Sequence, residues 1–502
     1  MESLPVELLH QIFSSLCFHC QNPGVFPNAD LDHVLNDKKA LAHLCRTSKY
    51  ICSIAQPILY HYYATGNTDS RATRNFEYDF LPQFIRTIAQ RPDLASQITT
   101  MHLVENGPLE GYDSQIQTIE SLIEFSISKN LLEEPCLPDD WCEGRVEQWC
   151  IADNPFYQIL HCWLATLAVV LSPRFNSLYL DTEGGCWLPD LEDCPHIKLL
   201  SLQTLGLMSH AINYFHDSSP DTKELCLAAS NIKTIYVHNA YNSSSAVEWF
   251  RTFKDSYGHK SPLSNAKRLA ISHLHWGDVK ILLRSASELE EFELYWEENI
   301  NWVWHHGLGN VVDLLDLVKA TLNKLCIGWI PRSDRRLPAA PSSYRLVGSL
   351  YEYPKLEYLS IDCFLLYNHK GSAGYNYNIP NRLVDIPNQL VDFLPQRIRF
   401  LRISYVYGDI TKSLRQLVAD APDKFPFLKE IVVGIFNDYE NCLRTAMSLE
   451  GEFEASGIKF TMVNDSSNAD LRTLIPGDVI GSRTPPIPRI RDMLEKEAEE
   501  SV

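Results

Sequence analysis

The chain has 502 residues, of which 45% are hydrophobic, and a formal net charge of −19 at pH 7. Its length exceeds what one ordinary hydrophobic core supports, so we expect a small module joined to an extended or multi-part domain. The acidic balance, without a strongly basic run, disfavours nucleic acid and anionic membranes as partners. The longest apolar run, residues 159–171, is too short to span a bilayer.

The 14 cysteines are scattered along the chain, many of them within apolar patterns. The first residues carry Glu2 and Glu7 and lack the basic segment of a signal peptide. We therefore expect reduced, mostly buried thiols in an intracellular protein of the cytoplasm, the nucleus or both.

Residues 4–16, LPVELLHQIFSSL, predict an amphipathic helix. Pro5 suits the first helical turn, and Glu7 falls at the third helical position, where a carboxylate complements the free amides. Leu8, Ile12 and Leu16 share one stripe. Such a helix needs a surface to pack against, either in this chain or in a partner.

A Pro-, Asn- and Asp-rich loop is expected over residues 17–36, and two more helices over 37–63. Leu41, Leu44 and Cys45 have helical spacing, and the same spacing recurs from Ile51 onward, with a bend or break at Pro57. Three short helices in so few residues make a marginal independent core.

Three runs carry a family resemblance: Leu4-Pro5-x-Glu7-Leu8-Leu9-x-x-Ile12-Phe13-x-x-Leu16, Leu41-x-x-Leu44-Cys45-Arg46-x-Ser48-Lys49 and Ala55-x-Pro57-x-Leu59-Tyr60. They resemble the F-box, particularly its fungal form, although the loop over 17–36 is longer than in the typical motif. Residues 80–98 resemble the segment that often follows in fungal F-box proteins with leucine-rich repeats.

The resemblance implies that the helical trio binds the Skp-type adaptor of an SCF (cullin–RING) ubiquitin ligase and, through it, the cullin. The side chains that would supply this apolar surface are Leu4, Pro5, Leu8, Ile12, Leu16, Leu41 and Leu44. The alternative is a helical cap that buries its stripe on the downstream domain.

A repeated template, L-x-x-L-x-L, indicates short strands over much of the remaining chain. It matches residues 98–103, 175–180, 197–202, 289–294, 322–327, 356–361, 398–403 and 428–433, and more weakly 222–227 and 266–271. Helical patterns alternate with these strands, at residues 245–253, 276–286, 309–321, 381–396 and 409–421. The alternation predicts stacked strand–helix units; a conventional α/β sheet is the alternative.

The predicted fold class is therefore α/β: an N-terminal all-α three-helix F-box followed by an irregular leucine-rich-repeat-like α/β solenoid. The expected boundaries are residues 1–66 for the F-box, 67–97 for a helical linker or repeat cap, and 98–475 for the repeats. An acidic, loop-like insertion is expected near 104–155. For the Pro-rich, acidic tail over 476–502, a short helix and disorder both remain open.

Enzymatic signatures such as a nucleophile elbow, a phosphate-binding loop or a zinc-protease motif are absent from the sequence, so we expect a non-enzyme without cofactor. Cys17-x-x-Cys20, with His19 between the cysteines, has the spacing of half a zinc site. No second half is evident, which favours thiols in a flexible loop over a metal site. Trp296, Trp302 and Trp304 either pack between repeats or form a protein-binding patch.

These observations predict a substrate receptor for ubiquitin-dependent degradation that captures an unknown target protein through its repeats. The alternative is an F-box and repeat scaffold acting outside a ligase. Period-two alternation in the strands places Tyr179, Asp181, Glu293, Tyr295 and Asp362 on the concave face, where we expect contacts to a target with basic and apolar residues. Recognition by loops is the alternative.

Overall fold

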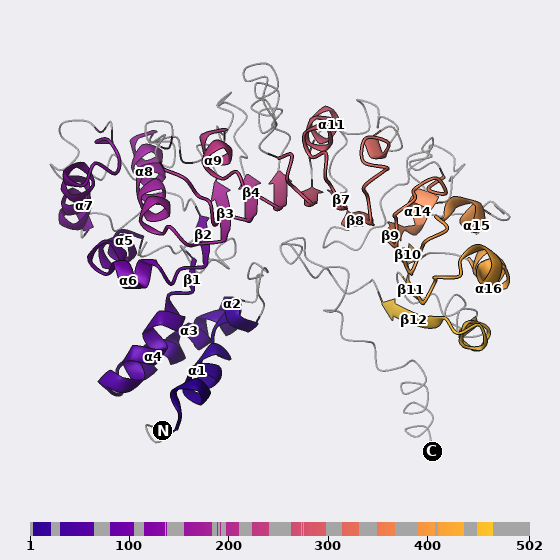
Figure 1. The fold of residues 1–502 in the computed structure, drawn as a ribbon, viewed down its shortest axis with the longest axis horizontal. Helices are drawn as coiled ribbons and strands as arrows, with labels where there is room; N and C mark the ends of the chain where they lie inside the picture. Colours follow the sequence, from indigo (N-terminus) through magenta and orange to yellow (C-terminus); the bar gives the residue numbers. More distant parts are fainter. Residues whose placement is uncertain are drawn as a thin grey trace, which may run out of the picture. The chain divides into compact units, whose positions relative to one another are not determined.

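A computed structural model of the chain describes residues 4–21, 31–64, 81–104, 115–135, 155–182, 197–209, 223–239, 263–272, 276–297, 314–330, 349–366, 389–406, 410–435 and 449–464, with the single positions 137, 188, 191 and 274. These residues fall into two compact units, one ending at Ala266 and the other beginning at Lys267. Helices and strands alternate in both units, so the chain is a mixed α/β protein (Figure 1).

The first unit opens with helices α1 (Val6–Ser14), α2 (Phe18–Gln21), α3 (Leu31–Cys45) and α4 (Lys49–Leu59). The expected loop over 17–36 is therefore wrong at both ends. The helical spacing of Leu31, Val34 and Leu35 continues into the pattern around Leu41, and this explains why α3 begins earlier than expected. Residues 22–30 lie outside the described part of the chain.

Pro5 and Pro57 take positions slightly different from those expected. Pro5 precedes α1 as its cap residue, and its carbonyl oxygen accepts hydrogen bonds from the N–H groups of Leu8 and Leu9, both at 3.1 Å. Pro57 lies inside the last turn of α4, which continues to Leu59 rather than breaking. Ser48 caps the other end of α4, where its Oγ accepts from the Ile51 N–H at 3.2 Å.

Strands β1 (Tyr62–Ala64), β2 (Thr100–Val104), β3 (Ser177–Thr182), β4 (Thr204–Ser209) and β5 (Thr234–Asn239) of the first unit pair in parallel and in chain order. Their helices are α5 (Leu81–Gln90), α6 (Pro92–Ala95), α7 (Ile116–Ser128), α8 (Pro155–Leu171) and α9 (Lys223–Ala228). Figure 1 shows α5, α8 and α9 on the same face of these strands, which gives two layers.

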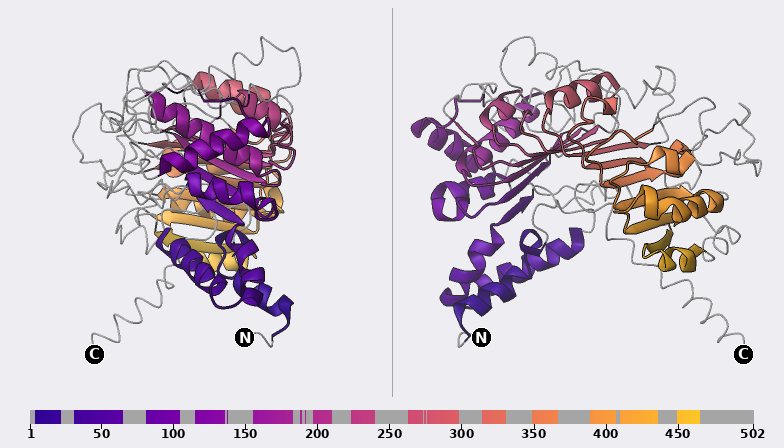
Figure 2. Two further views of the ribbon diagram at one scale, coloured as in Figure 1. Left: turned by 90° about the vertical axis from the view of Figure 1, so that its left-hand side faces the viewer. Right: turned by 45° about the vertical axis from the view of Figure 1, so that its right-hand side comes forward.

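The second unit continues this pattern with strands β6 (Arg268–Ser272), β7 (Glu291–Glu297), β8 (Lys324–Ile330), β9 (Tyr358–Asp362), β10 (Phe400–Val406), β11 (Glu430–Ile435) and β12 (Lys459–Asn464). They too pair in parallel with their chain neighbours. Its helices are α11 (Trp276–Ser285), α14 (Cys363–Leu366), α15 (Gln389–Phe393) and α16 (Thr411–Lys424). Figure 2 shows the ribbon from two further sides.

A tight turn precedes most strands and buries a regular set of side chains. The N–H of Leu289 donates to the Ala286 carbonyl at 3.2 Å, and that of Leu428 donates to the Phe425 carbonyl at 3.0 Å. Buried residues then follow three and five positions later. The resulting pattern, Ω-x-x-Φ-x-x-Φ-x-Φ with Ω and Φ buried and mostly apolar, recurs at residues 95–103, 199–207, 229–237, 263–271, 286–294, 353–361, 395–403 and 425–433.

This pattern confirms most of the predicted strands and corrects two of them. Residues 197–202 form the turn before β4 instead of a strand. A second match to the template begins five residues later, over residues 202–207, and it supplies the buried side chains of β4. Residues 222–227 fall largely in helix α9, and strand β5 follows over Thr234–Asn239. Strands β1 and β12 were not expected from the template.

Among the predicted helices, those over 276–286 and 409–421 are confirmed as α11 and α16. Residues 316–321 form turns, and α15 covers only Gln389–Phe393 of the helix expected over 381–396. The expected insertion near 104–155 contains helix α7, so it is not loop-like throughout. Residues 245–253, 309–313, 381–388 and the tail over 476–502 lie outside the described residues. Within the described ranges, even the apolar α8 lacks the combination of length and apolarity needed to cross a membrane.

One cross-strand row runs through the second unit, defined by Arg268, Glu291, Lys324, Tyr358, Phe400, Glu430 and Lys459, which are neighbours in strand register. Glu291 lies 3.5 Å from Arg268 and 3.6 Å from Lys324. The Tyr358 and Phe400 rings stack with centroids 4.3 Å apart, and Lys459 lies 2.6 Å from Glu430. Most neighbours in the row are therefore complementary in charge or in ring stacking.

We expect Gly206→Ala to destabilise the first unit strongly, because the Tyr179 ring of β3 lies across Gly206 of β4. A Cβ atom at Gly206 would stand 2.2 Å from Cδ2 of Tyr179, which is itself only 2% exposed. Overpacking of this kind costs about 1–3 kcal/mol. Thermal unfolding of the full chain, with hydrogen–deuterium exchange of β3 and β4 peptides, measures the loss.

Gly451→Ala is the matched control, since nothing lies within 4 Å of a Cβ added there and the residue is helical. This variant is expected to gain up to about 1 kcal/mol from helix propensity. Equal melting temperatures for the wild type and Gly206→Ala would contradict the packing of Tyr179 on Gly206.

Candidate functional site

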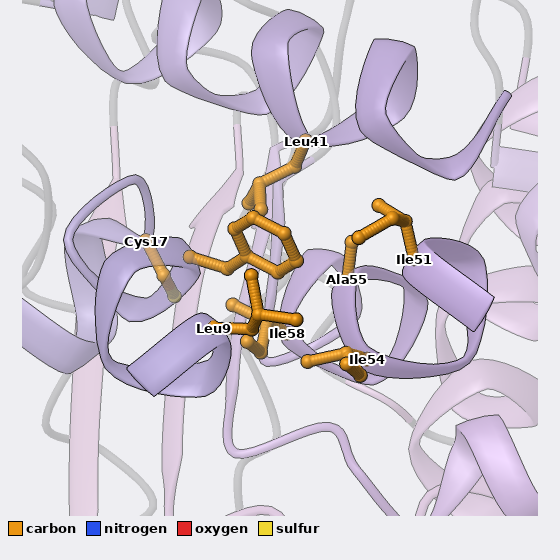
Figure 3. Close-up of a cluster of buried hydrophobic side chains, with 8 residues drawn as sticks. Leu9, Cys17, Leu41, Ile51, Ile54, Ala55 and Ile58 are labelled. Carbon is orange, nitrogen blue, oxygen red and sulfur yellow. The ribbon is translucent and has the colours of Figure 1, made fainter. Parts of the chain in front are cut away.

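Helix α1 has two apolar faces, and only one of them is used inside the chain. Leu9 and Phe13 are 0% and 1% exposed, and Figure 3 shows Leu9 with Cys17, Leu41 and Ile58 in one buried cluster. The cluster also contains Ile51, Ile54 and Ala55 of α4. Residues four apart lie on the same helix face, so this face fixes α1 against α3 and α4.

The face of α1 next to this one, about 100° around the helix, exposes large apolar side chains. Leu8 is 46% and Ile12 50% exposed, and Leu4, just before the helix, is 37% exposed. We call Leu4, Leu8 and Ile12 the α1 stripe. Contiguous exposed apolar side chains of this size are typical of interaction surfaces.

The residues proposed to bind the adaptor divide into three groups by exposure. Leu4, Pro5, Leu8 and Ile12 are exposed, while Leu16 and Leu44 are half-buried and pack against the internal cluster. Leu41 is only 1% exposed and lies within that cluster, so its expected place on the contact surface is wrong. Its side chain is needed between α1 and α4, where it supports the surface from beneath.

The residues expected on a concave target site are not exposed as predicted. Tyr179, Glu293, Tyr295 and Asp362 are all buried, with exposed fractions between 2% and 7%. Asp181 lies in β3, but its side chain is outside the described part of the structure. The strands therefore bury side chains on both faces, and these four cannot contact a target directly.

Charge pairing and close packing explain how Glu293 and Tyr295 are accommodated. Arg268 Nη2 donates to Glu293 Oε1 at 2.7 Å, and the Tyr295 hydroxyl donates to Glu293 Oε2 at 2.8 Å. The Tyr295 ring lies across the neighbouring strand at Gly328, 3.1 Å from where a Cβ would stand. Burial raises the pKa of Tyr295 well above its ordinary value, so the phenol keeps the proton it donates.

A second cluster joins residues that the sequence alone did not connect. Cys17, His19 and Cys20, at the α1–α2 junction, meet His61, which follows α4, and their donor atoms all lie within 4.8 Å of one another. Cys17 is 4% exposed and belongs to the internal cluster, so the expectation of thiols in a flexible loop is wrong for it. The Cys17-x-x-Cys20 motif gave no sign of His61 as a further ligand, because His61 is far from Cys20 in the sequence.

Hydrogen bonding within this cluster favours a thiolate at Cys20. Hydrogen bonds from Cys17, His19 and His61 hold the pKa of Cys20 well below its usual range. The hydrogen bond with Cys20, together with burial, raises the pKa of Cys17. Of the two thiols, Cys20 is therefore the one that loses its proton more readily.

The comparisons with known proteins do not identify a family for this chain. No protein-family model matches the chain, and no curated protein matches its sequence. The assignment of function therefore depends on the α1 stripe and on the residues of the runs that resemble the F-box.

Proposed function

We propose that this chain is the substrate-recognition subunit of an SCF-type cullin–RING ubiquitin ligase. The observation that carries the proposal is the α1 stripe, an exposed apolar face on a helix whose adjacent face is already buried against α3 and α4. A helical cap would have buried this face within the chain. In the described residues Leu8 and Ile12 instead keep about half of their surface in solvent, at 46% and 50% exposed.

The chemistry of the α1 stripe fits a protein partner with an apolar groove. Burying a large aliphatic side chain contributes about 1.5–3 kcal/mol, so a few such residues suffice for a stable complex. Tyr50, at the start of α4, is a further exposed amphipathic side chain of the helical module, at 40%. Leu16 and Leu44, half-buried beside the internal cluster, would complete the surface with Leu4, Pro5, Leu8 and Ile12.

The repeated strands would form an irregular leucine-rich-repeat-like solenoid that captures the target. The recurring turn–strand pattern and the parallel pairing of successive strands support this part of the proposal. Because Tyr179, Glu293, Tyr295 and Asp362 are buried, target recognition would use other surfaces, including loops between the repeats. The ubiquitin-transfer chemistry would belong to other subunits of the ligase.

The test is reconstitution of the full chain with a purified Skp-type adaptor, followed by addition of the cullin. We expect a stable complex with the adaptor on size-exclusion chromatography, and recruitment of the cullin only when the adaptor is present. A chain that is folded but does not bind any Skp-type adaptor would favour the scaffold acting outside a ligase.

A further inference from the structure

We infer that Cys17, His19, Cys20 and His61 form a structural zinc site that joins the α1–α2 junction to the end of α4. The inference goes beyond the proposed ligase function and does not depend on it. It is carried by four donor side chains, two sulfurs and two imidazole nitrogens, that converge from two places far apart in the sequence.

The donor separations are compatible with a tetrahedral site. Cys20 Sγ lies 3.2 Å from His61 Nδ1, and the rings of His19 and His61 are nearly perpendicular, at 80°, with centroids 5.8 Å apart. Zinc bonds of about 2.3 Å to sulfur and about 2.0 Å to nitrogen place tetrahedral donors about 3.3–3.8 Å apart. The donors here lie within 4.8 Å, so closure needs only small side-chain rotations.

The donor set selects the metal. Two thiolates and two imidazoles in a tetrahedral arrangement suit zinc, whereas calcium and magnesium require oxygen ligands. Nδ1 of His19 is a buried atom with no hydrogen-bond partner among the described residues, although buried polar atoms are ordinarily paired. A metal ion would give this nitrogen a partner in the ring orientation that points Nδ1 at the cluster.

The surrounding fold gives the metal a structural task. Helix α2 has four residues, Phe18–Gln21, none of which is fully buried; Cys20 packs against the internal cluster and Phe18 lies beside Tyr62. The carbonyl of His61 accepts hydrogen bonds from the N–H groups of Thr99 and Thr100, both at 3.0 Å, which fixes that residue beside β2. Zinc would therefore attach the short, partly exposed α2 to a firmly held position, closing a loop that contains α3 and α4.

The experiment measures metal in the full-length chain, purified under reducing conditions with a tag that contains no histidine. We expect one zinc ion per chain by elemental analysis. After exchange into cobalt, we expect the visible absorption of tetrahedral cobalt(II) and a near-ultraviolet thiolate-to-cobalt band. Chelation should speed hydrogen exchange in α2 peptides, because metal binding is coupled to local folding.

Matched variants separate the site from other cysteines and histidines of the helical module. Cys20→Ser and His61→Asn should lower zinc affinity at least about 100-fold. Cys52→Ser and His43→Asn, in α4 and α3, should leave zinc content and the cobalt spectrum unchanged. Circular dichroism establishes that each variant is folded.

Two results would overturn the inference. One is a folded wild-type chain that takes up no more zinc than Cys20→Ser. The other is a Cys17–Cys20 disulfide in freshly prepared protein that, once reduced, leaves thiols without affinity for zinc or cobalt. Neither result would bear on adaptor binding by the α1 stripe, so the two proposals can fail separately.

Discussion

Replacing Leu8 and Ile12 together by aspartate is expected to abolish binding of the Skp-type adaptor while the chain stays folded. Both side chains belong to the α1 stripe and are 46% and 50% exposed, so neither is needed for internal packing. An uncompensated carboxylate in a buried interface costs about 3 kcal/mol or more, and each 1.4 kcal/mol is about tenfold in affinity. Two of them should reduce affinity by more than about 1,000-fold, measured by isothermal titration calorimetry.

The matched control for this double variant is His10→Asp with Gln11→Asp. Both positions are exposed on α1 and outside the α1 stripe, and they receive two new carboxylates as well. Binding by the control at near wild-type affinity, with loss in the stripe variant, locates the interface. If the stripe variant still binds while both proteins melt normally, the F-box assignment is wrong.

Phe13→Ala is expected to destabilise the helical module by about 3–5 kcal/mol, the usual cost of emptying a large aromatic site in a core. Phe13 is 1% exposed and fills the space among Leu9, Leu41 and Ile58. Hydrogen–deuterium exchange of peptides from α1 and α4 measures the local effect. Adaptor binding should weaken too, because α1 would no longer be held in place.

Leu8→Ala serves as the comparison, one helix face away from Phe13. It removes a partly exposed side chain, so the free energy of unfolding should change by no more than about 0.5 kcal/mol. Similar exchange rates in the two variants would show that α1 is not fixed through its Phe13 face.

The template predicted the strands well at most of its matches, and failed where a second match follows within ten residues. At residues 197–207 the windows beginning at Ile197 and Leu202 both fit L-x-x-L-x-L, and only the second is the strand. The longer pattern, which includes the buried residue of the preceding turn, distinguishes the two windows. Its four buried positions are occupied by Leu199, Leu202, Leu205 and Leu207. That turn residue was the missing signal.

The candidate sites were harder to predict, because they depend on which neighbour a side chain meets. Leu8 with Ile12 and Leu9 with Phe13 have the same apolar character and spacing, so only the position of α3 and α4 decides which pair is buried. Alternation correctly placed Tyr295 and Glu293 on one strand face, but burial of that face depends on Arg268 and Gly328 from neighbouring strands. Sequence spacing could not predict that His61 contacts Cys20, because the packing of the helices between them determines whether the two side chains meet.

The cross-strand row of the second unit also restricts how the array of repeats can change its length during evolution. Loss of the repeat that contains β7 would bring Arg268 beside Lys324, two like charges in adjacent register. Duplication of the same repeat would set a second glutamate beside Glu291. Gain or loss of a whole strand unit by unequal recombination is thus penalised at the new junction, whereas the connecting segments can vary in length without disturbing the row.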